Sequence, residues 1–316
     1  MDTPPVIDLT NEVFLRRDAI AWGYTDRGIQ LRVRAGEWHR VRRGAYVSGP
    51  LWRELSETDR HRVRARAVLL TAHPTAVLSH VSAAVELGAP VWDVDLSVVH
   101  VTRTDRKPRR REAGVWHHRG ILVDGEIQEV NGVRVTAPLR AAVEVPTVVG
   151  VEQALVMVDG LLRIASADPQ DVKTALDRAT HWPRSLANEV IFRLADSRHE
   201  SAAETRTHFM CWRQGVPCPE PQVEIFDQRG RPFARVDFAW RKYGVFLEFD
   251  GRIKYERFRR PNESLEDFLM REKRRELRIC QLTGWVCIRI GWADLENPVP
   301  TAARIRGILD SRRTSA

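Results

Sequence analysis

The stretch Arg235-Val-Asp237-Phe-Ala-Trp240, followed by Val245-Phe-Leu-Glu248-Phe-Asp250-Gly251, decides the fold of the last third of this 316-residue chain. Both runs alternate side chains with the period of two that is typical of a β-strand. The connection at 241–244 is short, so we expect the two strands to pair antiparallel as one buried hairpin. Each strand carries carboxylates near its end.

These carboxylates are the first candidate site. A charged group within an apolar strand is costly unless it is paired or bound to a metal. Asp237, Glu248 and Asp250 lie at the strand ends, and Glu204 lies on a helix expected to begin after Ser201. Because Mg²⁺ prefers oxygen ligands, we expect Glu204, Asp237, Glu248 and Asp250 to bind this cation.

Two structural alternatives stay open for the same residues. Glu204 stands three residues after Ser201, which is the spacing of a capping box at a helix start. The carboxylates as a group also suit an inert scaffold in which they serve only as hydrogen-bond partners.

Sequence on both sides of the hairpin predicts a small α/β domain. A helix from 201 to about 214 precedes a strand at 221–227, and the hairpin follows it. A charged helix at 261–280, ended by Gly284, and a buried strand at 285–290 complete the domain.

This order, with its acidic residues, resembles the restriction-endonuclease-like superfamily, and more narrowly its group related to very-short-patch-repair endonucleases. The matching acids are Glu204 on the first helix, Asp237 on the second strand and Glu248 on the third. The runs at 272–275 and 284–289 match the closing helix and strand of that group. The resemblance covers residues 200–296 and implies metal-dependent hydrolysis of DNA phosphodiester bonds.

One position departs from that pattern. The lysine expected two residues after Glu248 is Asp250 in this chain, and Lys254 is the nearby replacement. The resemblance therefore implies Glu204, Asp237, Glu248 and Lys254 as catalytic residues.

The N-terminal residues predict two helices and a basic hairpin. A helix at 14–22 ends at Gly23, and a second helix, capped by Thr25 or Asp26, runs to Ala35. Residues 37–47 then form two strands around an Arg-Arg-Gly turn. Helix, turn, helix and hairpin is the order of a winged helix-turn-helix.

The second helix has the pattern of a DNA-reading helix. Ile29 and Val33 share its apolar face, while Arg27, Gln30 and Arg34 lie on the other side. Arginine and glutamine can bind base edges in the major groove. The arginines expected to hold phosphates from the hairpin are Arg40, Arg42 and Arg43. A solvated basic helix and hairpin without a ligand is the alternative.

Residues 14–47, which contain Arg42-Arg43-Gly44-Ala45-Tyr46 near their end, resemble the N-terminal winged-helix domain of AbiEi-type antitoxins. The resemblance implies a transcriptional autorepressor of a type IV toxin–antitoxin operon. It also implies double-stranded DNA as a partner and a cognate nucleotidyltransferase toxin encoded nearby.

Residues 51–199 are expected to form an α/β connecting domain that can also dimerise the protein. Helices at 57–72 and 79–88 precede strands near 96–102, 114–119 and 130–135, and a helical region follows. Because no partner stands at metal-ligand spacing from His80 in the sequence, we expect a capping or packing role for this histidine.

Composition favours an anionic partner and gives no sign of a membrane segment. The net charge is +8 and the pI about 9.8, with arginine in excess of lysine, although a GC-rich genome also produces this bias. No apolar run reaches membrane-spanning length, and the N-terminus lacks a signal-peptide pattern. Four cysteines without zinc spacing predict reduced core thiols and a cytoplasmic protein.

We therefore expect an α/β multidomain protein. Its parts are a winged helix-turn-helix at 1–50, an α/β spacer at 51–199 and a restriction-endonuclease-like α/β core at 200–316. A DNA-binding regulator of the antitoxin kind is the favoured function, and a metal-dependent DNA endonuclease directed by its winged helix is the alternative.

Overall fold

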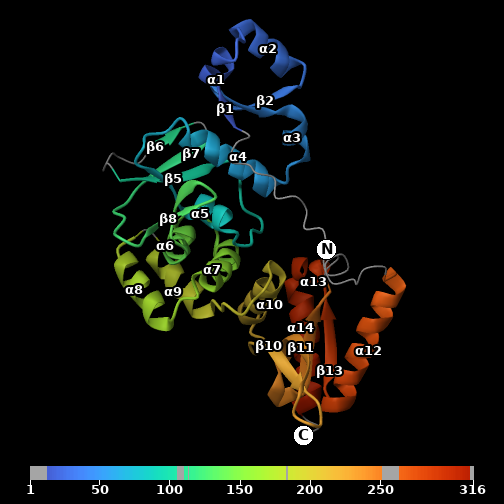
Figure 1. Cartoon of the computed structure of the whole chain (residues 1–316). Helices are drawn as coiled ribbons and strands as arrows, with labels where there is room; N and C mark the ends of the chain where they lie inside the picture. Colours follow the sequence, from blue (N-terminus) through green and yellow to red (C-terminus); the bar gives the residue numbers. More distant parts are fainter. Residues whose placement is uncertain (1–12, 105–109, 113, 183, 251–262, 314–316) are drawn as a thin grey trace. The chain divides into compact units, whose positions relative to one another are not determined.

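The protein is a mixed α/β chain with several sheets and more than one domain (Figure 1), which confirms the expected fold class. The computed structural model describes residues 13–104, 110–112, 114–182, 184–250 and 263–313. The chain divides into two compact units, Met1–Arg193 and Leu194–Ala316. The first unit contains the region expected as a winged helix and nearly all of the expected connecting domain.

The N-terminal region, residues 13–55, consists of short helices around a three-stranded sheet in the order β1-β3-β2. Its elements are β1 (Phe14–Leu15), α1 (Arg16–Ala21), α2 (Asp26–Arg34), β2 (Trp38–Arg42), β3 (Ala45–Ser48) and α3 (Gly49–Glu54). The helix expected from Phe14 is wrong at its start, because Phe14 and Leu15 pair with β3 as an edge strand. Ring contacts of Phe14 with Trp38 and Tyr46 hold that strand in place.

Two glycines permit the close turns of this region. Gly44 has φ +78° in the tight turn between β2 and β3, a conformation that other L-residues rarely adopt. A side chain on Gly49 would place its Cβ 2.0 Å from the carbonyl oxygen of Gly36. The chain after the hairpin can therefore pass against the end of α2 only because residue 49 has no side chain.

The rest of the first unit is a six-stranded sheet, in the order β6-β7-β5-β4-β9-β8, with helices packed on it. Its strands are β4 (Ala76–Leu78), β5 (Val99–Arg103), β6 (Arg110–Glu112), β7 (Val115–Arg119), β8 (Ile127–Val130) and β9 (Val133–Thr136). Its helices are α4 (Glu57–Leu69), α5 (His80–Leu87), α6 (Pro138–Glu144), α7 (Val151–Ala165), α8 (Pro169–Ala179) and α9 (Ser185–Leu194). The short strands β4, β6 and β8 were not expected from the sequence.

The second unit is a four-stranded sheet, in the order β10-β11-β12-β13, between two groups of helices. Its elements are α10 (Ala202–Arg213), β10 (Glu220–Phe226), β11 (Pro232–Trp240), β12 (Val245–Phe249), α12 (Leu265–Thr283), β13 (Val286–Ile290), α13 (Trp292–Glu296) and α14 (Pro298–Arg313). The hairpin is antiparallel as expected, with Phe238 opposite Leu247, and β13 runs parallel to β12.

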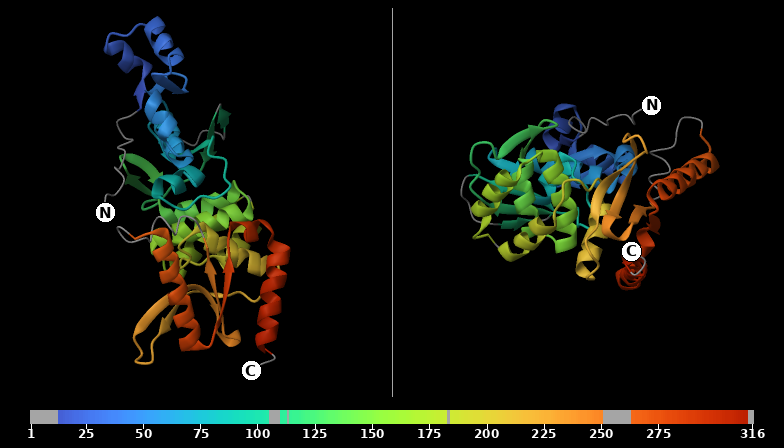
Figure 2. Two further views of the ribbon diagram at one scale, coloured as in Figure 1. Left: turned by 90° about the vertical axis from the view of Figure 1, so that its right-hand side faces the viewer. Right: turned by 90° about the horizontal axis from the view of Figure 1, so that it is seen from below.

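The two faces of this sheet have separate apolar cores. One face packs against α10, α13 and α14, and the other packs against α12 through Ile279 and Cys280. Figure 2 shows α12 and α14 on opposite sides of the strands. Helices α13 and α14 were missed by the sequence analysis, although Ile305 and Leu309 of α14 are fully or almost fully buried against the sheet.

All four cysteines are free thiols. Cys211 is buried, and burial raises its pKa to about 12. Cys280 and Cys287 pack at the edge of a core, but Cys218 is exposed in the connection between α10 and β10. The expectation of core thiols is therefore wrong for Cys218. Within the described ranges, none of the helices is both long and apolar enough to span a membrane.

Candidate functional site

The outer face of α2 carries the polar residues that the sequence assigned to DNA. Thr25 caps the helix, since its hydroxyl accepts a hydrogen bond of 3.1 Å from the amide of Gly28. Ile29 is buried in an aromatic cluster, which turns the opposite face of the helix outward. The exposed residues on that face include Arg27, Gln30 and Arg34.

The hairpin that follows adds further cations. Arg40 and Arg43 are exposed, whereas Arg42 is half-buried and burial lowers its pKa. Neighbouring arginines are neutralised, as in the pair of Arg16 with Asp26 at 2.6 Å. In contrast, within the described part of the chain no carboxylate pairs with any of the five arginines that we call the basic set, namely Arg27, Arg34, Arg40, Arg42 and Arg43.

The predicted acidic site in the second unit begins with Glu204, which is only 4% exposed. Its carboxylate accepts hydrogen bonds from the Ser201 hydroxyl at 2.7 Å, the Glu200 amide at 2.9 Å and the Gln222 side chain at 2.7 Å. Burial raises the pKa of Glu204, and the nearby charge of Asp237 adds to this effect. The Ser201 hydroxyl accepts from the Glu204 amide at 3.3 Å, as expected for a helix cap, but the Glu204 carboxylate bonds to the amide of Glu200 rather than to that of Ser201, so the capping box is incomplete.

Asp237 and Glu248 lie on adjacent strands but contact different groups. Asp237 accepts a hydrogen bond of 2.8 Å from the backbone amide of Phe249. Glu248 is 6% exposed, and Nη2 of Arg275 on α12 donates to it at 2.9 Å. The same guanidinium bonds to Glu272 at 3.1 Å. The arginine thus supplies the positive charge that was expected from a metal ion.

Asp250 follows β12 and is exposed. Its carboxylate lies 3.7 Å from Arg289, which also pairs with Glu276 at 2.6 Å. Glu248 and Asp250 line a cavity of about 430 Å³ between the strand ends and α12. Lys254 lies outside the described residues.

The four acids do not form a single ligand set in this arrangement. Among the described residues, no three of Glu204, Asp237, Glu248 and Asp250 bring their oxygens within 4.8 Å of one another. They form two pairs instead: Glu204 beside Asp237, and Glu248 with Asp250 on the cavity. As arranged, the carboxylates do not present the converging oxygens that Mg²⁺ requires.

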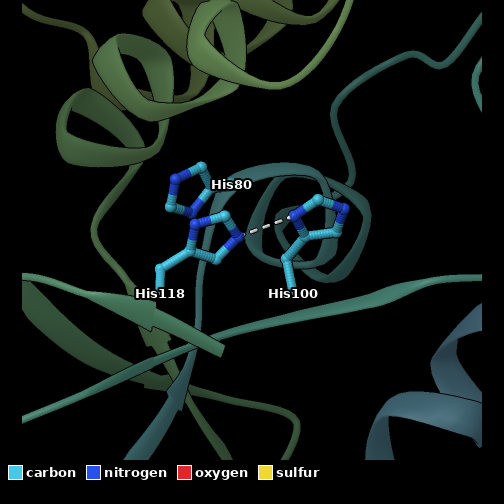
Figure 3. A group of neighbouring side chains, drawn as sticks. All are labelled: His80, His100 and His118. Carbon is cyan, nitrogen blue, oxygen red and sulfur yellow. Dashed lines mark hydrogen bonds between the residues drawn. The ribbon is translucent and has the colours of Figure 1, made fainter. Parts of the chain in front are cut away.

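Three histidines of the first unit do converge. His80 at the start of α5, His100 on β5 and His118 on β7 bring one nitrogen each to within 4.8 Å of the others (Figure 3). The Nδ1 atom of His100 lies 3.0 Å from Nε2 of His118, and the rings of His80 and His118 stack at 3.7 Å. All three are buried.

The neighbours of His80 could not be found from sequence spacing, because they come from two strands later in the chain. β5 and β7 pair in parallel with Thr102 opposite His118, which puts His100 and His118 two positions apart on neighbouring strands. Alternation along each strand was visible in the sequence, but the pairing register was not. Only the register could have shown this cluster.

The protein is thus a mixed α/β protein that has, among the described residues, five N-terminal arginines without a carboxylate partner and two clusters of titratable side chains. A scan against known protein families finds no match. Two uncharacterized proteins of Mycobacterium tuberculosis, from strains CDC 1551 / Oshkosh and H37Rv, are each 31% identical over 192 residues. The match covers 60% of this chain and 67% of each relative. The chain therefore belongs to the same family as these mycobacterial proteins.

Proposed function

We propose that the protein is a DNA-binding transcriptional regulator of the AbiEi-type antitoxin kind. The observation that carries the proposal is the basic set on α2 and its hairpin, which has no carboxylate partner in the described structure. Cations without partners on neighbouring elements attract an external polyanion, and duplex DNA has the required charge density.

The form of the region agrees with such a ligand. An α-helix fits the major groove, where Arg27, Gln30 and Arg34 would contact base edges. Arg40, Arg42 and Arg43 on the hairpin would contact phosphates, which orient a protein on DNA without reading its sequence. A cap at Thr25 and burial of Ile29 fix the orientation of α2 before DNA is bound.

The regulatory proposal includes further partners. It places the protein in the cytoplasm, with a nucleotidyltransferase toxin encoded nearby. As a homodimer the protein would bind two half-sites, so its operator would contain a repeated sequence.

Footprinting of the DNA upstream of its own gene tests this function. We expect the full chain to protect an inverted or direct repeat there, and to leave a shuffled sequence of equal length unprotected. The variant with Arg27→Ala and Gln30→Ala should lose this footprint. Equal protection of the shuffled DNA would contradict the regulatory proposal.

The cavity beside Glu248 favours a second candidate, a metal-dependent DNA endonuclease directed by the N-terminal region. Its lining includes four carboxylates, which belong to Glu248, Asp250, Glu272 and Glu276. For Mg²⁺ to bind Asp237 and Glu248, Arg275 would have to release Glu248. Such an ion would supply charge neutralisation and an activated water molecule.

Incubation of the full chain with plasmid DNA and Mg²⁺ or Mn²⁺ tests this candidate. Glu248→Ala should abolish cleavage, whereas Glu266→Ala should retain it, because Glu266 is an exposed acid on the same helix that binds Glu248. Intact plasmid with the wild-type chain would eliminate the nuclease and leave the regulator unaffected.

A further inference from the structure

We propose that His80, His100 and His118 form a binding site for a divalent transition metal ion, with Zn²⁺ as the best match. This site lies in the six-stranded part of the first unit and does not depend on the proposed DNA-binding function.

The distances suit such an ion. Zinc–nitrogen bonds are about 2.0–2.1 Å long, and two ligands of a tetrahedral zinc ion are therefore about 3.3 Å apart. The nitrogens of His100 and His118 are already 3.0 Å apart, and those of all three residues lie within 4.8 Å. Because the rings of His80 and His118 stack, these side chains would have to rotate for all three nitrogens to bind one ion.

The burial of the cluster favours imidazole as a metal ligand. His80, His100 and His118 are 6%, 5% and 4% exposed, so protonated rings would be poorly solvated. Neutral imidazole is the form that binds zinc.

Neighbouring groups fix the positions of the rings. Glu144, which is 1% exposed, accepts a hydrogen bond of 3.1 Å from the backbone amide of His80, and its carboxylate lies 3.8 Å from Nδ1 of that ring. His80 has φ +52°, an uncommon conformation for a non-glycine residue, and such conformations concentrate at functional sites. The Ser82 hydroxyl accepts from the amide of His100 at 2.8 Å. The Nδ1 atom of His80 lies 2.9 Å from the Ser79 hydroxyl, and a hydrogen bond to the other ring nitrogen orients a metal-binding histidine.

Three protein ligands leave a fourth position for water or a small ligand, as in zinc sites that are not purely structural. His100 also lines a cavity of about 450 Å³ in the same unit, together with Trp116 and Arg111. A small anion in this cavity would meet the Arg111 guanidinium. The alternative is a metal-free stack of rings joined by the bond between His100 and His118.

Metal titration of the full chain separates these two possibilities. After treatment with a chelator and dialysis, Zn²⁺ should bind by calorimetry at one ion per chain with a micromolar or lower dissociation constant. Bound Co²⁺ should show the visible absorption of a tetrahedral site.

Variants assign the site to the histidine cluster. His118→Gln should lose the tight site, whereas His118→Cys should retain it because thiolate also binds zinc. His73→Gln is the matched control, since His73 is an exposed histidine of the same unit outside the cluster. Circular dichroism checks that each variant is folded, and wild-type Co²⁺ absorption provides the test if His118→Gln does not fold.

Two results would overturn the proposal. One is a wild-type chain that binds neither Zn²⁺ nor Co²⁺ at micromolar free metal. The other is a folded His118→Gln variant that binds zinc as tightly as the wild type.

Discussion

The basic set of the N-terminal region differs from the arginines beside the C-terminal sheet in its carboxylate partners. On α2 and its hairpin, the basic set has no carboxylate partner among the described residues. In the second unit, Arg275 holds Glu248 and Glu272, and Arg289 holds Glu276. Charge that is paired inside the protein serves the fold, and charge that is left without a partner is available for a ligand.

This difference decides how the composition is interpreted. A net charge of +8 predicts an anionic partner without saying where it binds. Within the described residues, the structure places the five arginines of the basic set, which have no carboxylate partner, on α2 and its hairpin. It also shows that two conspicuous acids, Glu204 and Glu248, already have partners in the protein.

The largest effect is expected from Arg275→Ala. This change leaves the Glu248 carboxylate without its cation, which should cost up to about 3 kcal/mol of unfolding free energy, since the pair is only partly buried. Urea unfolding of the full chain measures the loss, and Arg43→Ala should change stability by less than about 0.5 kcal/mol. If Mg²⁺ restores the stability of the Arg275→Ala variant, Glu248 has become a metal ligand. A loss below about 1 kcal/mol would contradict a structural role for the pair.

Next in size is the effect of the α2 face on DNA affinity. Arg27→Ala should weaken binding to the preferred site about tenfold or more, because one base contact contributes about 1–3 kcal/mol. Fluorescence anisotropy with labelled duplex measures the change. Arg178→Ala on α8, where the arginine is exposed, is the control and should bind like the wild type. Equal losses in the two variants would remove α2 from the interface.

Acidification should weaken the fold through His208. Burial, with the charges of His199 and Arg198, lowers the pKa of His208 to about 4. The unfolded chain therefore takes up this proton first, and stability falls as pH drops from about 6.5 to about 4. The contribution is on the order of 2 kcal/mol. The urea midpoint of His208→Gln minus that of the wild type should be larger at pH 4.5 than at pH 7.5. The same difference at both pH values would refute the assignment.

The smallest effect is expected at the cap of α2. Thr25→Ala removes the acceptor for the Gly28 amide and should cost about 1 kcal/mol, whereas Thr25→Ser should retain the bond. Thermal unfolding of the two variants measures the difference. DNA affinity should follow the same order, because the cap fixes the start of the helix. Indistinguishable melting of Thr25→Ala and Thr25→Ser would show that this bond contributes nothing.

Local signals in the sequence were sufficient for much of the fold. Apolar alternation located β11 and β12, and hydroxyl residues such as Ser201 marked helix starts. Elements whose character depends on distant contacts were missed. Phe14 becomes a strand because it pairs with Tyr46, and α14 is covered by a sheet that its own weakly periodic sequence does not indicate.

The candidate sites depend even more than the fold on contacts between distant parts of the chain, which the sequence does not show. The sequence correctly predicted that Arg27, Gln30 and Arg34 are exposed, since helical periodicity alone separates them from the buried Ile29. It did not reveal that Arg275 holds Glu248, because that contact depends on how α12 crosses the sheet. The histidine cluster likewise depends on strand register, which no local pattern in this chain specifies.

The salt dependence of DNA binding tests the central claim most directly. With the full chain and duplex DNA, the variant with Arg42→Ala and Arg43→Ala should bind every sequence more weakly. Its plot of log affinity against log salt concentration should be shallower by about one unit for each arginine that no longer neutralises a phosphate. Arg178→Ala should reproduce the wild-type affinity and slope. If the double variant retains full affinity and the full slope, the basic set does not bind DNA and the account is wrong.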